Sequence, residues 1–209
     1  NPFLFNTVEM IRHRTIQGGA YEVTYSYKRC LWDHEEREFR GFGEVKVTDS
    51  EGNATLTTYL QDDIFKGRIK ESAAFDAAGN LYNKVVHAWG SQALSGGGNF
   101  VFLKRADRYT YDGNATGRRT AEEYEYAETP QLGNITKLTQ LGEVDLTSGA
   151  DIGTDKRTVE TVYGNNTSGP WLVGFPQCVK VRDQAGALVK ESRFYYDGAT
   201  SYTSLPTKG

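Results

Sequence analysis

The sequence predicts an all-β protein, an antiparallel sheet made of successive β-hairpins. Three observations favour this fold class. Segments in which apolar and polar side chains alternate recur along the chain, and turns rich in Gly and Asn separate them. No stretch shows the i, i+3, i+4, i+7 apolar stripe of an amphipathic helix. The composition agrees, because 23 Gly, 13 Tyr and 10 Phe among 209 residues suit many strands joined by tight turns.

The expected hairpins follow one another along the chain. Each has two alternating segments around a turn containing Gly, Asn or Asp, which tolerate the positive φ angles of tight turns. The expected hairpins consist of strands 44–48 and 54–60 around turn 49–53, strands 68–75 and 81–89 around turn 76–80, strands 124–126 and 135–139 around turn 132–134, and strands 178–182 and 188–198 around turn 183–186. A further strand is expected at 108–111, followed by a turn at 112–114. The stretch 120–126 also admits a helical turn, although its Tyr-x-Tyr spacing fits a strand.

The turns repeat at irregular intervals, which indicates a degenerate repeat of hairpins rather than a strict solenoid. The expected turn glycines are Gly52, Gly79, Gly113, Gly133, Gly164 and Gly186, and loops are expected at 95–99, 147–153 and 164–170. None of these loops indicates a domain boundary. We therefore treat 1–209 as one all-β segment. Its first and last residues look like the interior of a longer chain, so we expect it to be an excised segment of one.

Charge and hydropathy exclude two classes of partner. With 24 Lys and Arg against 27 Asp and Glu, the formal charge is -3, so the chain has no net positive field to attract nucleic acid or an anionic membrane surface. No apolar run approaches the roughly 18 residues of a membrane span. We therefore expect neither nucleic-acid binding nor a membrane span.

The two cysteines, Cys30 and Cys178, lie far apart in the sequence and have no neighbouring Cys or His. Such a spacing does not suit a zinc site. Two buried free thiols are the favoured interpretation, and a long-range disulfide is the alternative.

The most specific stretch is an octapeptide in which charges alternate before two glycines: Glu36, Arg37, Glu38, Phe39, Arg40, Gly41, Phe42 and Gly43. On a regular strand, Phe39, Gly41 and Gly43 would share one face, whereas Arg40 and Phe42 would share the other. The two glycines leave room for a ring or a backbone to approach closely. The charges can pair across strands. The octapeptide is therefore predicted to be a packing and bracing element.

Together with Asp-x-x-Gly-Asn turns and Tyr-Asp-Gly, this octapeptide resembles the RHS/YD-repeat proteins. The greatest likeness is to the region after the propeller or integrin-like repeats in toxin-complex B subunits and SpvB-type proteins, and it runs from about Tyr25 to Gly209. The resemblance implies a strip of a large β-sheet shell that encloses a C-terminal toxin. It also implies a secreted or cell-surface virulence protein of bacteria, whose partners are the remaining repeats of the parent polypeptide and the enclosed toxin. The family's self-cleaving Asp-Pro motif does not occur in this sequence.

Residues suited to catalysis do not form a recognisable set. His34 and Glu36 could share one side of a strand and chelate a metal weakly, but a solvated turn is the favoured interpretation. Asp62-Asp63 and Glu122-Glu123 are adjacent carboxylates, which a strand separates across the sheet. Ser91 lacks the Gly-x-Ser-x-Gly context, and Gly96–Gly98 lacks the Lys-Ser/Thr of a phosphate loop. We therefore expect no catalytic, cofactor-binding or metal-binding residues, no cofactor, and a protein that is not an enzyme.

Pairs of tyrosines at i, i+2 provide an alternative function. Tyr109 with Tyr111, and Tyr124 with Tyr126, would each share a face of a strand, and such pairs can stack sugar rings. A carbohydrate-binding sheet is therefore the alternative hypothesis, in keeping with a property attributed to YD repeats. Cross-strand aromatic packing explains the same pairs without a ligand and is favoured.

The ends of the predicted sheet suggest a last expectation. Outermost strands expose unpaired backbone N–H and C=O groups, which can take up a further strand. We expect these docking strands at Thr7–Ile16 and Glu191–Tyr196. Separated from its parent, the segment should self-associate through them in a concentration-dependent manner.

Overall fold

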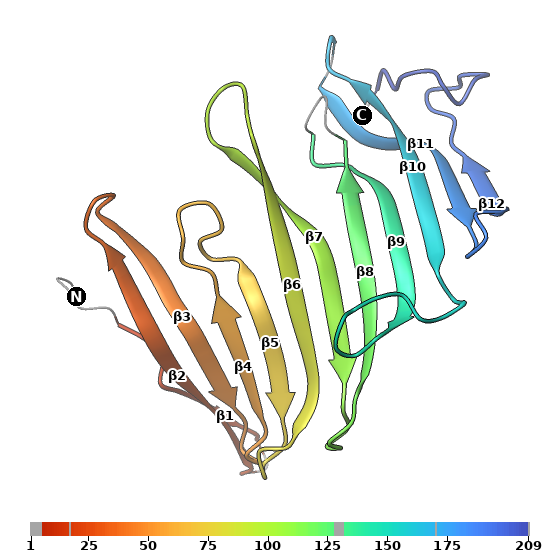
Figure 1. Cartoon of the computed structure of the whole chain (residues 1–209). Helices are drawn as coiled ribbons and strands as arrows, with labels where there is room; N and C mark the ends of the chain where they lie inside the picture. Colours follow the sequence, from red (N-terminus) through yellow and green to blue (C-terminus); the bar gives the residue numbers. More distant parts are fainter. Residues whose placement is uncertain (1–5, 17, 128–131, 170, 209) are drawn as a thin grey trace. The chain divides into compact units, whose positions relative to one another are not determined.

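A computed structural model describes residues 6–16, 18–127, 132–169 and 171–208. Within these ranges every regular element is a β-strand, and the strands are hydrogen-bonded in chain order, each to the next (Figure 1). The predicted all-β sheet of successive antiparallel hairpins is therefore confirmed. The strands are β1 (Met10–Arg14), β2 (Ala20–Asp33), β3 (Glu38–Thr48), β4 (Ala54–Tyr59), β5 (Ile69–Phe75), β6 (Leu81–Ala93), β7 (Asn99–Thr110), β8 (Arg118–Tyr126), β9 (Ile135–Val144), β10 (Arg157–Asn166), β11 (Leu172–Arg182) and β12 (Leu188–Arg193).

The contacts between residues divide the chain into two compact units. The first unit comprises Asn1–Trp89 and Asp107–Arg119, and the second comprises Gly90–Ala106 and Thr120–Gly209. Strands β1 to β5 belong to the first unit and β9 to β12 to the second, whereas the long strands β6, β7 and β8 contribute residues to both. Each unit is described by itself below.

Little of either unit is fully buried. In the first unit the buried apolar side chains among the described residues are the small ones of Ala54 and Ala73. The second unit has a small cluster of Ala121, Leu141 and Val144. Strands of a single layer have no opposing layer to cover them, so most side chains are half-buried by their neighbours on the sheet. Cross-strand pairs and well-formed turns must therefore supply much of the stability.

Three hairpins have the same type of turn. In the turns that begin at Asp49, Asp76 and Asp183, the backbone N–H four residues later donates to Asp Oδ1 at 2.9, 2.7 and 2.8 Å. The glycine three residues after each Asp has a φ between 83° and 90°. This is the three-residue hairpin loop whose last residue is left-handed. Hydrogen bonds from the following Asn side chain, and then from backbone N–H groups, hold the pKa of Asp49 and Asp76 below the ordinary value.

Both Tyr-Asp-Gly sequences form a second kind of turn. Asp112 and Asp197 have φ angles of 51° and 55°, and the glycines after them have 77° and 74°. The carbonyl of Tyr111 accepts the N–H three residues later at 2.8 Å, and that of Tyr196 does so at 2.9 Å. Two successive positive φ angles with this bond are the signature of a type I′ turn. The motif therefore works through its backbone conformation.

The prediction for Gly164 is wrong. Gly164 is a buried residue inside β10, which continues to Asn166, so the loop expected at 164–170 begins only after that residue. A Cβ added at Gly164 would lie 2.7 Å from Nε2 of Gln177, whose side chain packs over it. The glycine is needed for this close approach rather than for a turn. The stretch 120–126 is strand, as part of β8. Residues 132–134, where a turn is expected, lie between β8 and β9, and Gly133 has the positive φ of 77° expected of a turn glycine. Positions 128–131, just before them, lie outside the described residues.

The cysteine prediction is half right. Cys178 is a buried free thiol on β11, so no disulfide joins it to Cys30. Cys30, however, is exposed on β2. The described part of the chain also contains no helix that is long and apolar enough to cross a membrane.

The strands at the two ends of the order are β1 and β12, as expected for Thr7–Ile16 and Glu191–Tyr196. β12 ends at Arg193, although the N–H of Phe194 still donates to the carbonyl of Gln177 at 3.0 Å. Beyond it the chain folds back, and Gln177 Nε2 donates to the carbonyl of Ser204 at 3.0 Å. Association of copies through these edges stays a prediction.

The turn analysis predicts the effect of a matched pair of substitutions. Gly79→Ala places a Cβ on a residue with a φ of 87° and should lower the free energy of unfolding by about 1–2 kcal/mol. Gly96→Ala is the control, since Gly96 also faces open space but does not have a positive φ. Urea unfolding of both variants measures the difference. Equal losses at the two positions would contradict the assignment of the turn.

Candidate functional site

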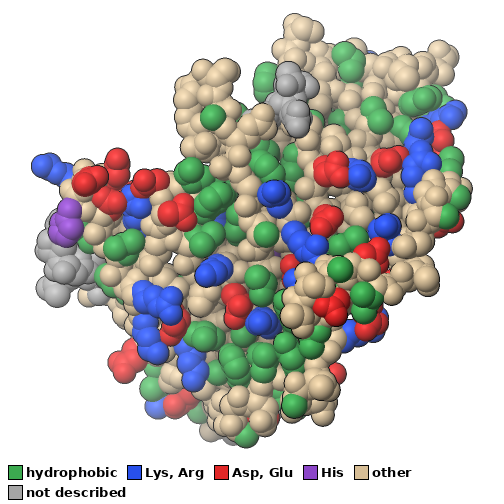
Figure 2. Space-filling model, in the orientation of Figure 1, with side chains coloured by type: hydrophobic (Ala, Val, Ile, Leu, Met, Phe, Trp, Pro, Cys, Tyr) green, Lys and Arg blue, Asp and Glu red, His purple; other side chains and the backbone are tan. Residues whose placement is uncertain are grey.

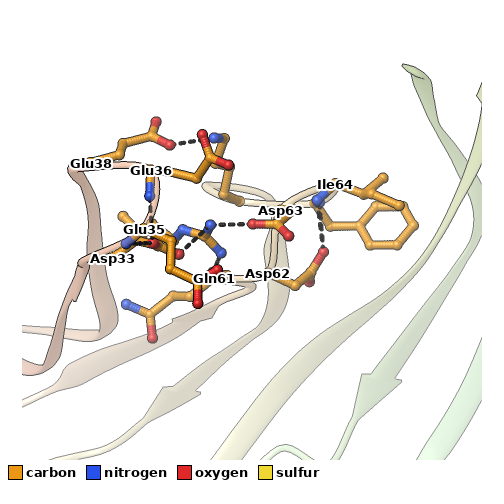
Figure 3. Close-up of polar contacts among 11 residues, drawn as sticks. Asp33, Glu35, Glu36, Glu38, Gln61, Asp62, Asp63 and Ile64 are labelled. Atoms are coloured by element: carbon orange, nitrogen blue, oxygen red, sulfur yellow. Dashed lines mark hydrogen bonds and ion pairs between the residues drawn. The ribbon is translucent and has the colours of Figure 1, made fainter. Parts of the chain in front are cut away.

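A group of polar contacts in the first unit joins the β2–β3 turn to the loop between β4 and β5 (Figure 3). We call it the Arg40 junction. Its members come from segments well separated in the sequence: Asp33, Glu38, Arg40, Gln61, Asp63 and Lys66. The first three belong to or adjoin the octapeptide, and the other three belong to the loop. The octapeptide therefore meets a second segment that the sequence did not connect with it.

The β2–β3 turn is built around Asp33. Its Oδ1 accepts the backbone N–H groups of Glu35 and Glu36, both at 2.9 Å. The hydrogen bond from Glu36 is the main cause that lowers the pKa of Asp33; burial opposes it, and the bond from Glu35 and the Arg40 charge add to it. Glu36 and Arg37 consequently lie in the turn, and the strand expected from residue 36 begins at Glu38. The solvated turn predicted around His34 is confirmed.

A β-bulge at Gly41 overturns the predicted division of the octapeptide between two faces. The register runs from Cys30 opposite Phe42 to Trp32 opposite Phe39, so β3 carries one extra residue. Gly41 has a φ of 80°, as such a bulge requires. The rings of Phe39 and Phe42, predicted on opposite faces, are in edge-to-face contact with centroids 5.6 Å apart.

Gly43 provides the space for the loop to dock. A Cβ there would lie 2.6 Å from Oε1 of Gln61, so the Gln61 side chain lies where any other residue would project. Gln61 Nε2 donates to the carbonyls of Arg29 and Gly41, both at 3.0 Å. The prediction that the two glycines allow close approach is confirmed, but the group that approaches is an amide side chain.

Arg40 completes the junction. Its side chain is 7% exposed, and its Nη2 lies 2.5 Å from Oδ2 of Asp33 and also pairs with Asp63. Its Nη1 donates to the carbonyl of Gln61 at 3.1 Å. Burial by itself would lower the pKa of Arg40, but the hydrogen bond with Asp63 and the charge of Asp33 raise it. The predicted bracing role of the octapeptide thus has a geometric basis.

Sequence reasoning missed the loop half of the junction. It placed Asp62-Asp63 on a strand, whereas both lie in a turn in which Asp62 Oδ1 accepts the N–H groups of Ile64 and Phe65 at 3.0 and 2.9 Å. An Asp followed within five residues by Gly67, which has a φ of 78°, was the available signal. Lys66 pairs with Glu38 across the junction.

The second unit has a comparable brace. Arg105 Nη1 lies 2.7 Å from Oε1 of Glu123, and its Nη2 donates to the carbonyl of Gly149 at 2.8 Å. The loop that follows β9 is thereby attached to β7 and β8. Glu122, the other member of the predicted carboxylate pair, accepts a hydrogen bond from the Tyr124 hydroxyl at 2.9 Å. These two adjacent carboxylates therefore have different partners.

The tyrosine pairs lie in different units. Tyr109 and Tyr111, in the first unit, are parallel with ring centroids 6.3 Å apart. Lys84 Nζ and Arg119 Cζ lie 4.6 and 5.0 Å from the centroid of Tyr109, within cation–π range. In addition, Arg119 Nε lies 3.0 Å from Oδ1 of Asp107, which is itself buried. This first pair is thus held by neighbouring side chains.

Tyr124 and Tyr126 belong to the second unit. The ring of Tyr126 packs against Phe100 and Phe102, with centroid distances of 5.8 and 5.1 Å. Burial raises the pKa of Tyr126. A pocket of about 260 Å³ adjoins these rings, and Gln92, Lys104 and Glu125 are also in its lining. Carbohydrate binding by either pair stays a prediction.

The histidines and acidic side chains of the described residues do not gather into a metal site. In the described ranges no group of three or more His, Cys, Asp or Glu side chains could hold a metal ion. His13 and His34 are exposed, whereas His87 on β6 is half-buried and its Nδ1 is buried without a hydrogen-bond partner among the described residues. Burial, together with the positive charge of Arg108, lowers the pKa of His87.

The fold is that of toxin-complex components. A chain in the crystal structure of TcdB2-TccC3-Cdc42 is similar over 99% of this chain, with a TM-score of 0.75 and 14% identity. TcdB2-TccC3 without its hypervariable C-terminal region is similar over 86%, with a TM-score of 0.71 and 14% identity. A chain in the structure of the Photorhabdus luminescens Tc holotoxin pore is similar over 78% of this chain, with a TM-score of 0.62 and 14% identity. At such identity the likeness shows a shared fold.

One family is also similar in sequence. The family described as the insecticide toxin TcdB middle/N-terminal region matches residues 2–71, which include both sides of the Arg40 junction. No curated protein matches the chain. The chain covers 15%, 13% and 12% of the lengths of the three solved chains, in the order given above. It therefore resembles part of a toxin-complex B subunit.

The junction predicts a non-additive pair of substitutions. Gly43→Ala forces the Gln61 side chain away from its two carbonyl acceptors and should cost about 1–3 kcal/mol of unfolding free energy. In a Gln61→Ala background the same change should cost clearly less, because the obstructing amide is gone. A double-mutant cycle by urea unfolding measures this coupling. Additive losses would show that Gln61 does not rest on Gly43.

The lowered pKa of the half-buried His87 predicts a loss of folding stability in weak acid. Its pKa is lower in the folded state than the 6.5 of an ordinary histidine, so the unfolded chain takes up the proton first as the pH falls. Stability attributable to His87 should be complete above about pH 6.5 and should decline below it until the folded-state pKa is reached. His87→Gln should make the thermal unfolding midpoint nearly independent of pH between pH 7 and 5. His34→Gln should leave the midpoint falling with pH as in the unmodified protein. Identical profiles for all three proteins would contradict this.

Proposed function

We propose that this chain is a non-catalytic structural segment of a bacterial toxin complex, of the RHS/YD-repeat type. In the parent protein it forms a strip of a β-sheet shell that encloses or presents a toxin, and the parent is secreted or lies at the cell surface. Its partners are the neighbouring repeats and the enclosed toxin. The similarity of residues 2–71 to a TcdB region and the shared fold of the solved toxin complexes support this assignment.

The observation that carries the proposal is an uncharged face on the first unit. Directly opposed residues of antiparallel strands project from the same face, so the register traces rows across the sheet. Two adjacent rows cross five strands without a charged residue: Tyr25, Val47, Thr55, Ala74 and Asn83, and Tyr27, Val45, Thr57, Ser72 and Val85. The Thr57 and Ser72 hydroxyls, 3.3 Å apart, agree with this register.

The opposite face of the same strands carries charges. Its rows are Ser26, Lys46, Leu56, Ala73 and Lys84, and Lys28, Glu44, Thr58, Glu71 and Val86. Lys28 Nζ pairs with Glu44 at 3.2 Å across two strands. Figure 2, which views one side of the whole molecule, shows charged and hydrophobic side chains intermingled on that side. Two such unlike faces suit a wall between solvent and an enclosed polypeptide, and we assign the uncharged face to the inside.

The ends of the strand order fit a segment of a larger sheet. The backbone of β12 pairs with β11 on one side only, and Leu188 and Val189 are exposed on it. An edge of this kind accepts a further strand. In the proposed parent, the neighbouring repeats supply these strands, which would replace the self-association expected of the separated segment. The tyrosine contacts favour packing, so carbohydrate binding is not proposed.

The two faces predict opposite outcomes for adjacent substitutions. Thr57→Lys places a charge on the uncharged face, whereas Thr58→Lys places it between Glu44 and Glu71 on the other. In the full parent polypeptide assembled with its toxin, Thr57→Lys should reduce the fraction of toxin protected from protease by about half or more, since an unpaired charge would contact the enclosed chain. Thr58→Lys should leave protection unchanged.

Two measurements keep this test interpretable. The thermal midpoint of each variant shows whether it folds, and Thr57→Gln, which is long but uncharged, should retain most of the protection. Equal protection in Thr57→Lys and Thr58→Lys, with both folded, would remove the inner-face assignment.

A further inference from the structure

We infer that the loop Leu60–Gly67 is a preformed docking site for another protein of the toxin complex, with Ile64 as its anchor. The partner that fits is a folded protein surface with an apolar pocket bordered by Lys or Arg. This inference rests on the proposed function only in taking the partner from the same complex. It concerns the loop between β4 and β5 rather than the face or the edges of the sheet.

The first observation is an apolar side chain at a loop rather than on a strand. Ile64 is 41% exposed, and the half-buried Phe65 follows it. In Figure 3, Ile64 lies away from the Arg40 contacts, beyond Asp62 and Asp63. An apolar residue at this position does not contribute to the pairs that hold the junction together. It is available to insert into a partner.

The second observation is that the loop is rigidly held by its own backbone. Besides the Asp62 carboxylate, which fixes the N–H groups of Ile64 and Phe65, the N–H of Lys66 donates to the carbonyl of Asp62 at 3.1 Å. The N–H of Gly67 donates to the carbonyl of Leu60 at 2.9 Å. The loop therefore returns on itself as a closed turn, which fixes the backbone position of Ile64.

The Arg40 junction then fixes this turn to the hairpin. Gln61 is held at two carbonyls of the hairpin, Arg40 binds Asp63 and the Gln61 carbonyl, and Lys66 binds Glu38. Contacts from three loop residues thus hold the loop against the hairpin. A loop that is ordered before binding loses little conformational entropy when a partner docks, and this increases affinity.

The third observation is the charge around Ile64. Residues 33–40 and 60–67 together contain six Asp or Glu and three Lys or Arg. Arg40 neutralises only one of its two carboxylate partners, and the exposed side chains of Glu35 and Glu36 have no ion-pair partner among the described residues. The net negative charge attracts a basic surface and disfavours an acidic one. This charge selects the chemistry of the partner.

The test uses the full parent polypeptide and the purified remaining components of its complex. Ile64→Ser should weaken their association at least about tenfold, as expected for an anchor residue. The matched control is Ile152→Ser, since Ile152 is 61% exposed in a loop of the second unit. The association of the unmodified protein should also weaken as the salt concentration rises. Unchanged affinity of Ile64→Ser, or equal losses in both variants, would overturn the inference.

Hydrogen exchange provides a readout that does not depend on a variant. Residues 60–67 should gain protection in the assembled complex, and lack of protection would overturn the docking site. Sedimentation of the separated segment tests whether a second copy of the chain binds at this loop. A dimer that Ile64→Ser abolishes would mean that a second copy occupies the site, which would contradict the proposal. Toxin protection in the Thr57 variants is measured separately, so failure of the shell function and failure of this docking site are distinguishable.

Discussion

Backbone pairing between strands that are consecutive in the chain is the interaction on which the rest of the structure depends. Because each described strand pairs with its chain neighbours in a single layer, few side chains are fully buried. The sheet therefore relies on turns that bring consecutive strands into register. The Asp-locked turns and the Tyr-Asp-Gly turns do so through positive φ angles and side-chain acceptors, with no contribution from a large core.

Hairpin ends are the weak points of such a sheet, and arginine braces hold them in both units. Arg40 and Arg105 each combine an ion pair with a hydrogen bond to a loop carbonyl, so one planar guanidinium joins two segments. Lysine, a point charge on a flexible stem, does not reproduce this forked geometry. The arginine braces thus make the loops at the hairpin ends rigid. A rigid loop is also suited to binding a partner protein.

The two faces of the first unit link the fold to the proposed function. A sheet that lacks a second layer exposes both faces to water, and the apolar side chains on its uncharged face favour a partner that covers them. In a shell, the enclosed polypeptide supplies that cover. The same strands can therefore serve as a wall without binding any particular small molecule, and the exposed edges allow the wall to continue into neighbouring repeats.

The sequence by itself determined the fold class, the hairpins and most turns, because alternation and turn residues act over short distances. It did not reveal the bulge at Gly41, the packing role of Gly164 or the exposure of Cys30, since each depends on what lies on a neighbouring strand. The octapeptide was recognisable as a brace, but its partners Gln61, Asp63 and Lys66 were not. Only the tertiary structure decided them, because register brings together segments whose separation in the sequence contains no signal.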